Sequence, residues 1–358
     1  MKTQSKQLDF NGQNMYTGID VHKKSWTVSI FCEDMFHKKF SQPPQPEVLV
    51  NYLKKMFPGA TYHCAYEAGF SGFWTYRKFI DLGVNCIVAN AADVPTTDKE
   101  RQQKDDGKDS LKLAMELRNG KLNGVYVPSP EGEQDRTLVR TRQNLQGNLT
   151  RCKNRVKSLL NHYGIEMPEK FIKSGHWSKI FMGWLHTLKF SHNSGTTSLQ
   201  LFLSEATFLR QLLLQANREI RELSRSERYA IRMKLLQTVP GIGLLGSMIL
   251  LTEIEDFNRF KKIDHLYSYV GLIPNTHSSG EKQVIGRMTH RGNHFLKYIL
   301  VESAWTAVRK DPALMIAFKE LCKRMDANKA IIRMTKKLLN RIVYVMKNKT
   351  PYIIGKVS

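Results

Sequence analysis

The stretch MYTGIDVHKKSWTVSIFCE, residues 15–33, decides the fold of the first part of the chain. Its two halves, MYTGIDVH and SWTVSIFCE, are dense in β-branched and aromatic residues, a composition that favours β-strands. A short basic turn separates them, and a third strand is predicted at MFHKKFSQ, residues 35–42. The sequence therefore predicts consecutive strands of one sheet.

The segments that follow alternate between helical and strand-like character. The helices are PEVLVNYLKKMF (46–57) and FSGFWTYRKFIDLG (70–83), and the strands are ATYHCAYEA (60–68) and VNCIVAN (84–90). Three strands followed by such alternation predict a mixed sheet with helices packed on it, an α/β domain over residues 14–130. Open sheets of this kind bind ligands beyond the carboxyl ends of their strands.

The charge balance points to a polyanionic partner. The chain has 358 residues, with 55 Lys and Arg against 32 Asp and Glu, and a formal net charge of +23. That length favours two or three domains. A surplus of this size repels itself, so nucleic acid is the first candidate partner. A basic membrane-surface protein or mere solubility remain alternatives, but the basic residues are spread along the chain and do not form one amphipathic anchor.

Cysteine usage and hydropathy exclude several other classes. The five cysteines are scattered and never form a C-x-x-C pair, which argues against a disulfide scaffold or a zinc finger. The start, MKTQSKQLDF, has no apolar signal region, and no apolar run reaches the roughly 18 residues of a membrane span. We expect a soluble protein of a reducing compartment with no membrane partner.

The middle of the chain, residues 131–232, has a coiled-coil pattern. A heptad seam over 202–223 faces a second apolar series over 145–159 in a strongly basic stretch. The seam consists of Phe202, Ala206, Leu209, Leu213, Ala216, Ile220 and Leu223. The two helices pair either as a coiled coil between subunits or as antiparallel helices within one subunit. Residues 165–198 between them are interpreted as an insertion with one amphipathic segment, HWSKIFMGWLHTL.

Residues 233–350 are predicted to form a helical domain with one long central loop. The loop, residues 275–293, has no apolar period, three glycines and two adjacent serines. Loops of this length inside a compact domain are usually functional or disordered.

Four acidic residues are candidate metal ligands in this basic chain. Asp20 and Glu67 end predicted strands, and Asp106 and Asp109 stand three residues apart at the start of a predicted helix, so they share a helical face. Convergence of these carboxylates would suit one or two Mg²⁺ ions, which prefer oxygen ligands completed by phosphate. The alternative is ordinary strand-edge charges and acids that complement a helix dipole.

Residues 235–254, LLQTVPGIGLLGSMILLTEI, have the pattern of a helix–hairpin–helix motif. The glycines of PGIG permit close backbone approach, and the second helix offers N–H groups to a phosphate. Such contacts position DNA without reading its sequence. The alternative is a packing corner in which Pro240 and Gly241 only break the helix.

The segment GLIPNTHSSGEKQ, residues 271–283, could present a serine nucleophile to a phosphate. Cations at Lys282, Arg287, His290 and Arg291 flank it and could stabilise the transition-state charge. The alternative is a flexible Ser-Gly turn.

In this order, the motifs resemble those of the DEDD transposases of the insertion sequence 110 family, the RNA-guided bridge recombinases, with Piv-type DNA invertases as relatives. The matching segments are GIDVHKKSW, YEAG, KDDGKDSLKLA, TVPGIGLLGSMILLTEI, FNRFKKIDHLYSYVGLIPNTHSSG and GRMTHRGNHFLKYIL. The resemblance spans nearly the whole chain apart from the first dozen residues and the insertion.

The resemblance implies a RuvC-like ribonuclease H fold in the N-terminal domain, coiled-coil helices and a helical C-terminal transposase domain with a catalytic serine. By motif position, the family's acidic tetrad corresponds to Asp20, Glu67, Asp106 and Asp109, and its nucleophile to Ser279. Asp105 adjoins Asp106, so that assignment depends on the three-residue step to Asp109. Ser278 adjoins Ser279 as the alternative nucleophile.

The resemblance also implies the partners and the reaction. These are Mg²⁺, double-stranded donor and target DNA, a guide RNA transcribed from the element's ends, and a homodimer or homotetramer in the bacterial cytoplasm at the nucleoid. The heptad seam is a possible subunit interface. Two other functions remain open: a metal-only junction-resolving nuclease, and a decayed, non-enzymatic nucleic-acid-binding protein.

Overall fold

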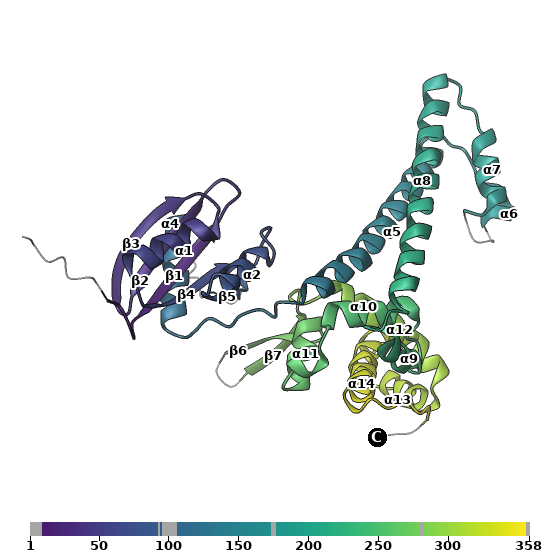
Figure 1. The fold of residues 1–358 in the computed structure, drawn as a ribbon. Helices are drawn as coiled ribbons and strands as arrows, with labels where there is room; N and C mark the ends of the chain where they lie inside the picture. Colours follow the sequence, from purple (N-terminus) through teal and green to yellow (C-terminus); the bar gives the residue numbers. More distant parts are fainter. Residues whose placement is uncertain (1–8, 92–93, 95–105, 173–176, 280–281, 356–358) are drawn as a thin grey trace, which may run out of the picture. The chain divides into compact units, whose positions relative to one another are not determined.

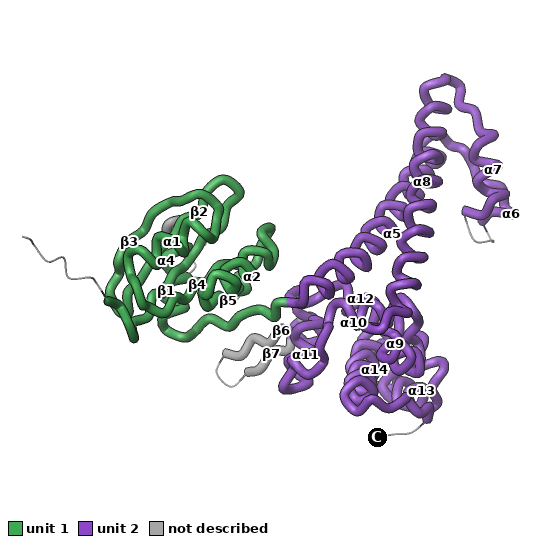
Figure 2. Tube along the Cα trace, in the orientation of Figure 1, with its two compact units in different colours: residues 1–127 green, residues 128–358 purple. Residues whose placement is uncertain are grey.

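The computed structural model describes residues 9–91, 94, 106–172, 177–279 and 282–355. The chain divides into two compact units, residues 1–127 and 128–358, which Figure 2 shows in different colours. Each unit has a hydrophobic core of its own. Among the helices of the described ranges, none combines the length and the apolar character that crossing a membrane requires.

The first unit contains the predicted mixed sheet. Its strands are β1 (Asn14–Val21), β2 (Trp26–Cys32), β3 (Met35–Gln42), β4 (Thr61–Glu67) and β5 (Asn85–Ala89). Their order in the sheet is β3-β2-β1-β4-β5. The first three strands are antiparallel neighbours, and β4 is parallel to both β1 and β5. This order places β1 and β4 side by side at the centre, with their carboxyl ends at the same edge.

Helices cover both faces of this sheet. They are α1 (Pro46–Met56), α2 (Trp74–Asp81) and α4 (Asp106–Arg118). Leu49 and Leu53 of α1 and Phe79 of α2 are fully buried in one core with Met15 and Ile19 of β1. The other face lies under α4, which contacts β1, β2 and β4. The sheet is therefore sandwiched, and α4 occupies its second face alone among the described helices.

Two long helices begin the second unit. They are α5 (Pro130–His162) and α8 (Asn193–Leu223), which Figure 1 shows running side by side. Leu149 and Cys152 of α5 pack with Ala206 and Leu209 of α8 in one apolar cluster. The heptad seam is thus confirmed as a helix-pairing face. Its partner is α5 of the same chain, which is the second of the two alternatives.

The seam, named above as a possible subunit interface, is covered largely by α5 of its own chain. Ala206, Leu209, Ala216 and Ile220 are buried within their own chain. Heptad spacing predicts that another helix covers the apolar stripe. It does not say whether that helix belongs to the same chain or to another, because both kinds of pair have the same spacing.

The insertion folds onto the distal end of the helical pair. It contains α6 (Glu169–Ile172) and α7 (Lys179–Thr187). Phe181 and Leu185 of α7 are buried against Leu160 of α5 and Leu203 of α8. The amphipathic pattern of HWSKIFMGWLHTL therefore has its apolar side on this small core.

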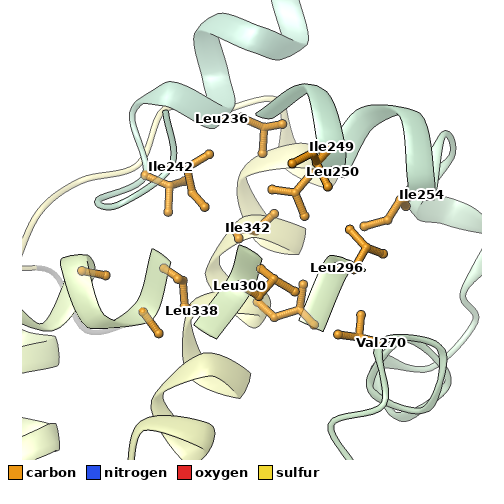
Figure 3. Packing of buried hydrophobic residues seen from close by; sticks show 14 of the residues in the cluster. Leu236, Ile242, Ile249, Leu250, Ile254, Val270, Leu296, Leu300, Leu338 and Ile342 are labelled. Carbon is orange, nitrogen blue, oxygen red and sulfur yellow. The ribbon is translucent and has the colours of Figure 1, made fainter. Parts of the chain in front are cut away.

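A helical bundle follows, as predicted. It comprises α9 (Ala230–Gln237), α10 (Leu244–Ile254), the short 3₁₀ helix η2 (Phe257–Arg259), α11 (Ile263–Val270), α12 (His294–Lys310), α13 (Pro312–Cys322) and α14 (Ala327–Asn348). Figure 3 shows Leu250 of α10, Leu300 of α12 and Ile342 of α14 converging in its core. Val139 of α5 and Ile220 of α8 belong to the same core, so the base of the helical pair and the bundle are one packed body.

The prediction of one long loop at residues 275–293 is wrong. Most of this segment forms a two-stranded antiparallel hairpin, β6 (Pro274–Ser279) and β7 (Lys282–Met288). Its residues are largely polar, so the apolar alternation that normally marks a half-buried strand is missing. Backbone pairing gives the segment its strand conformation without that signal.

Candidate active site

The site begins with a close approach of α4 to the sheet. A β-carbon at Gly18 of β1 would lie 2.0 Å from the carbonyl oxygen of Ser110 and 2.4 Å from the backbone nitrogen of Ala114. The hydroxyls of Ser29 on β2 and Ser110 are hydrogen-bonded at 2.9 Å. Only a residue without a side chain fits at position 18, so small residues fix α4 directly on the central strands.

Strand alternation then places two of the predicted acids on the α4 face. Gly18 pairs with Ala65 across the parallel β1–β4 ladder. Side chains two residues apart on a strand share a face, so Asp20 lies on the face of Gly18, and Glu67 on the face of Ala65. Both acids stand at the carboxyl ends of their strands. The two acids therefore share one face and one edge of the sheet.

The direction of α4 brings its first turn to the same edge. At the other end of the helix, Arg118 donates a hydrogen bond to the backbone oxygen of Asp34 at 3.2 Å, and its guanidinium stacks 5.2 Å from the ring of Phe31. Phe31 and Asp34 flank the carboxyl end of β2, which lies beside the start of β1. The opposite end of α4, where Asp106 and Asp109 stand, must then lie toward the carboxyl ends of β1 and β4.

The acids differ in what the structure describes of them. Asp20 is one-fifth exposed, and its Oδ2 lies 3.0 Å from Nε2 of His22. Glu67 and Asp109 are half-buried. Asp106 is the first residue of α4, but its side chain lies outside the described residues, as does Asp105 entirely. Across the side chains that are described, no three of His, Cys, Asp and Glu form a group suited to a metal.

The backbone arrangement nonetheless fits a divalent cation by its chemistry. The strand ends place Asp20 and Glu67 at one edge, and the start of α4 lies toward that edge. Carboxylate oxygens are the ligands that hard cations prefer. Sequence reasoning named these acids but missed Gly18, Ser29 and Ser110, which bring α4 to them. The signal was a glycine inside a strand otherwise rich in β-branched residues.

The predicted nucleophile lies at the tip of the hairpin in the second unit. Ser279 is the last residue of β6 and pairs with Lys282, and Ser278 pairs with Gln283. The side chains of both serines, and residues 280 and 281, lie outside what the structure describes. The backbone therefore sets Ser279 in a paired strand rather than within an unpaired loop.

A buried carboxylate binds the residue that caps α12, shortly after this hairpin. Glu253 of α10 is fully buried, and Arg140 of α5 donates to it through Nε at 2.6 Å and Nη2 at 2.7 Å. Hydrogen bonding to Glu253 raises the pKa of Arg140. Asn293, which caps α12 just after the hairpin, donates to the same carboxylate at 2.7 Å. Sequence reasoning missed this group, because its members are far apart in the chain.

The candidate helix–hairpin–helix turn contains two glycines in different surroundings. Gly241 has φ +84°, and a β-carbon there would lie 2.2 Å from the carbonyl oxygen of Ser303 on α12. It is therefore a packing corner. Gly243, the N-cap of α10, is exposed, and no atom lies within 4 Å of a β-carbon built on it. The turn thus has one glycine against the protein and one open to solvent.

Comparison with known proteins identifies the class. A family model for DEDD transposases of the IS110 type matches residues 17–165, and one described as the transposase IS116/IS110/IS902 family matches residues 233–320. A putative transposase, y4qE, of Sinorhizobium fredii is 30% identical over 68% of this chain and 58% of its own length. The transposase for IS1533 of Leptospira borgpetersenii is 26% identical over 92% of this chain and 96% of its own length. The transposase for IS1111A of Coxiella burnetii is 23% identical over 75% and 73%.

These matches define a transposase, a DNA-recombining enzyme. The chain belongs to the IS110 family of DEDD transposases. The residues from 166 to 232, which include nearly all of the insertion and all of α8, fall between the two family models.

Proposed function

We propose that this transposase cuts and rejoins donor and target DNA through a covalent phosphoserine at Ser279. Mg²⁺ would be held by the carboxylates of Asp20, Glu67, Asp106 and Asp109. An RNA transcribed from the element's ends would pair with both DNAs, so that base pairing selects the sequences and the protein binds shape and backbone.

One observation carries the metal site. Asp20 and Glu67 share a face and an edge of the sheet, and the first turn of α4 lies toward that edge. Mg²⁺ bound there would neutralise charge on the scissile phosphodiester. The close contact of Gly18 with Ser110 holds α4 directly against β1.

The serine step balances without an external energy source. The Ser279 hydroxyl loses its proton and bonds to phosphorus, while the bond from phosphorus to the 3′ oxygen breaks and that oxygen takes up a proton. The resulting phosphoserine ester is then attacked by a 3′ hydroxyl of another strand, which restores both the DNA ester and the serine. Because one phosphoester replaces another, no ATP is needed.

The basic surfaces support nucleic-acid partners. Between Arg136 and Lys157, helix α5 contains several Lys and Arg residues and no Asp or Glu. Such a stretch suits RNA or DNA phosphates. Recombining two duplexes requires four strand cuts, so we include a homodimer or homotetramer in the proposal.

The experiment is an analysis of products. Purified protein is incubated with DNA carrying the element's ends, Mg²⁺ and RNA transcribed from those ends. We expect a denaturation-resistant protein–DNA adduct and recombinant DNA, both dependent on RNA and Mg²⁺. Free 5′ phosphate ends without an adduct would establish the second candidate, a metal-only nuclease. Recombination that is independent of the RNA would refute guidance alone.

A further inference from the structure

A groove between the helical pair and the insertion combines an aromatic ring with several cations. It is lined by Leu149 and Lys153 of α5, Arg210 of α8, Lys179 of α7 and Trp177 just before α7, among others. Its volume is about 660 Å³. The residues that line it include no Asp or Glu. It is therefore a positively charged groove with an apolar floor.

Lys153 lies over the indole and close to other cations. The Lys153 ammonium lies 5.3 Å from the centre of the Trp177 ring. Partial burial lowers the pKa of Lys153, and the neighbouring charges of Arg210 and Lys157 lower it further. An anion bound in the groove would relieve this repulsion. The crowding indicates a site suited to an anionic ligand.

We propose that this groove binds single-stranded nucleic acid, with a base stacked on Trp177 and phosphates paired with Lys153 and Arg210. Aromatic faces flanked by cations are the usual means of holding unpaired nucleotides. In a duplex the bases are stacked inside, so a duplex has no base free for Trp177. RNA and single-stranded DNA share the required chemistry.

The site deepens the proposed function, because it gives an unpaired strand of the guide RNA or of opened DNA a place on the protein. Several residues of the groove also lie outside the segments that the family models match. Trp177, Lys179 and Arg210 fall between the two matched family segments. The insertion thus acquires a role: its α7 forms one wall of the groove and its core holds that wall in place.

The test measures binding by the full chain in the absence of cleavage. Fluorescence anisotropy is recorded with a labelled 12-nucleotide oligouridylate, the matching oligothymidylate and a 12-base-pair duplex. We expect Trp177→Ala to weaken binding of single strands about tenfold, equivalent to about 1.4 kcal/mol for one stacked base. Trp177→Phe should retain most of the affinity, and duplex binding should not change.

A matched pair of charge variants separates the groove from general basicity. Lys153→Gln should weaken single-strand binding about tenfold. Arg151→Gln, on the same helix but lining the opposite groove, should change it less than twofold. Equal losses for the two variants, or equal losses for duplex and single strand with Trp177→Ala, would overturn the proposal. A preference for oligouridylate over oligothymidylate would favour RNA as the source.

A second measurement needs no variant. Irradiation of the wild-type protein with an oligonucleotide containing 5-iodouracil should crosslink the peptide that contains Trp177. The proposal is contradicted if crosslinks form only at other peptides. It is also contradicted if poly-glutamate competes fully, because the groove would then bind acidic peptides. Ser279→Ala should bind the oligonucleotides normally, so failure of the catalytic proposal and failure of this site give different results.

Discussion

A β-carbon added to Gly18 would lie 2.0 Å from the carbonyl oxygen of Ser110, a distance at which backbone must move. This contact joins the central strand β1 to α4. It brings a helix that begins with Asp106 over a strand that ends beside Asp20. The acidic edge therefore depends on a residue that has no chemistry of its own.

Gly18→Ala should destabilise the first unit by about 3 kcal/mol, at the upper end of the range for overpacking, because the obstruction is backbone. Strand cleavage should fall with it, since α4 shifts. Urea unfolding measures the first effect. The control is Gly69→Ala, where the nearest atom is 3.9 Å away, and it should change stability by less than 1 kcal/mol. Equal effects of the two changes would contradict the packing account.

Removal of one tetrad carboxylate should abolish cleavage and leave DNA binding largely intact. Asp20→Ala and Asp109→Ala each remove a hard oxygen ligand but none of the basic surface. Gel-shift and cleavage assays on the same preparations separate the two properties. Asp81→Ala, an exposed acid at the end of α2, is the matched control and should cleave normally. Normal recombination by Asp20→Ala would refute the tetrad assignment.

Arg140→Ala should cost about 3 kcal/mol of unfolding free energy, because it leaves the fully buried Glu253 carboxylate without its guanidinium. We take the low end of the range because Arg140 itself is 52% exposed. Arg151→Ala, exposed on the same helix, should cost less than 1 kcal/mol in the same urea titration. If the two variants unfold at the same urea concentration, the pair of Arg140 and Glu253 does not stabilise the second unit.

The buried Asp311, which caps α13, should make the free energy of unfolding depend on pH. Burial of Asp311 raises its pKa, but hydrogen bonds involving Tyr352, Leu314 and Gly355 and the charge of Arg341 lower it below 3.8 overall. Its ionised form therefore stabilises the fold fully above about pH 3.8, and this contribution is lost as pH falls through the lower folded pKa.

Asp311→Asn should cost about 2 kcal/mol at pH 7 while still capping α13, since Asn is also a good N-cap. Thermal unfolding of the variant and the wild type at pH 7 and pH 3 should show a smaller difference at pH 3. The exposed Asp326→Asn should show little difference at either pH. A difference that grows toward pH 3 would contradict the direction of the pKa shift.

The strands of the first unit were predictable because their residue types are specific to strands. Dense β-branched and aromatic residues gave β1 and β2, and helix–strand alternation gave β4 and β5. The hairpin β6–β7 was not predictable in this way, because its strands carry polar residues and contain Pro274 and Gly286. Hydrogen bonds between their backbones define β6 and β7, and these leave no hydrophobic pattern in the sequence.

Contacts between distant residues were the other part that the sequence could not reveal. The seam of α8 was clear from its spacing, but whether α5 of the same chain or of another covers it was not. Arg140 and Glu253 are 113 residues apart, so no local pattern joins them. The acids could be named from motif order, whereas the contact of Gly18 with Ser110 required the fold.

The measurement that tests the central claim most directly is mass-spectrometric mapping of the covalent adduct. Wild type, Ser279→Ala and Ser278→Ala are incubated with labelled DNA, guide RNA and Mg²⁺, denatured and digested. In wild type and in Ser278→Ala, we predict a nucleotide joined through its phosphate to the Ser279 oxygen. With Ser279→Ala, we predict neither an adduct nor recombinant DNA. An adduct on Ser278 would shift the assignment by one residue. Recombination by both single variants and by the double variant would contradict serine catalysis itself.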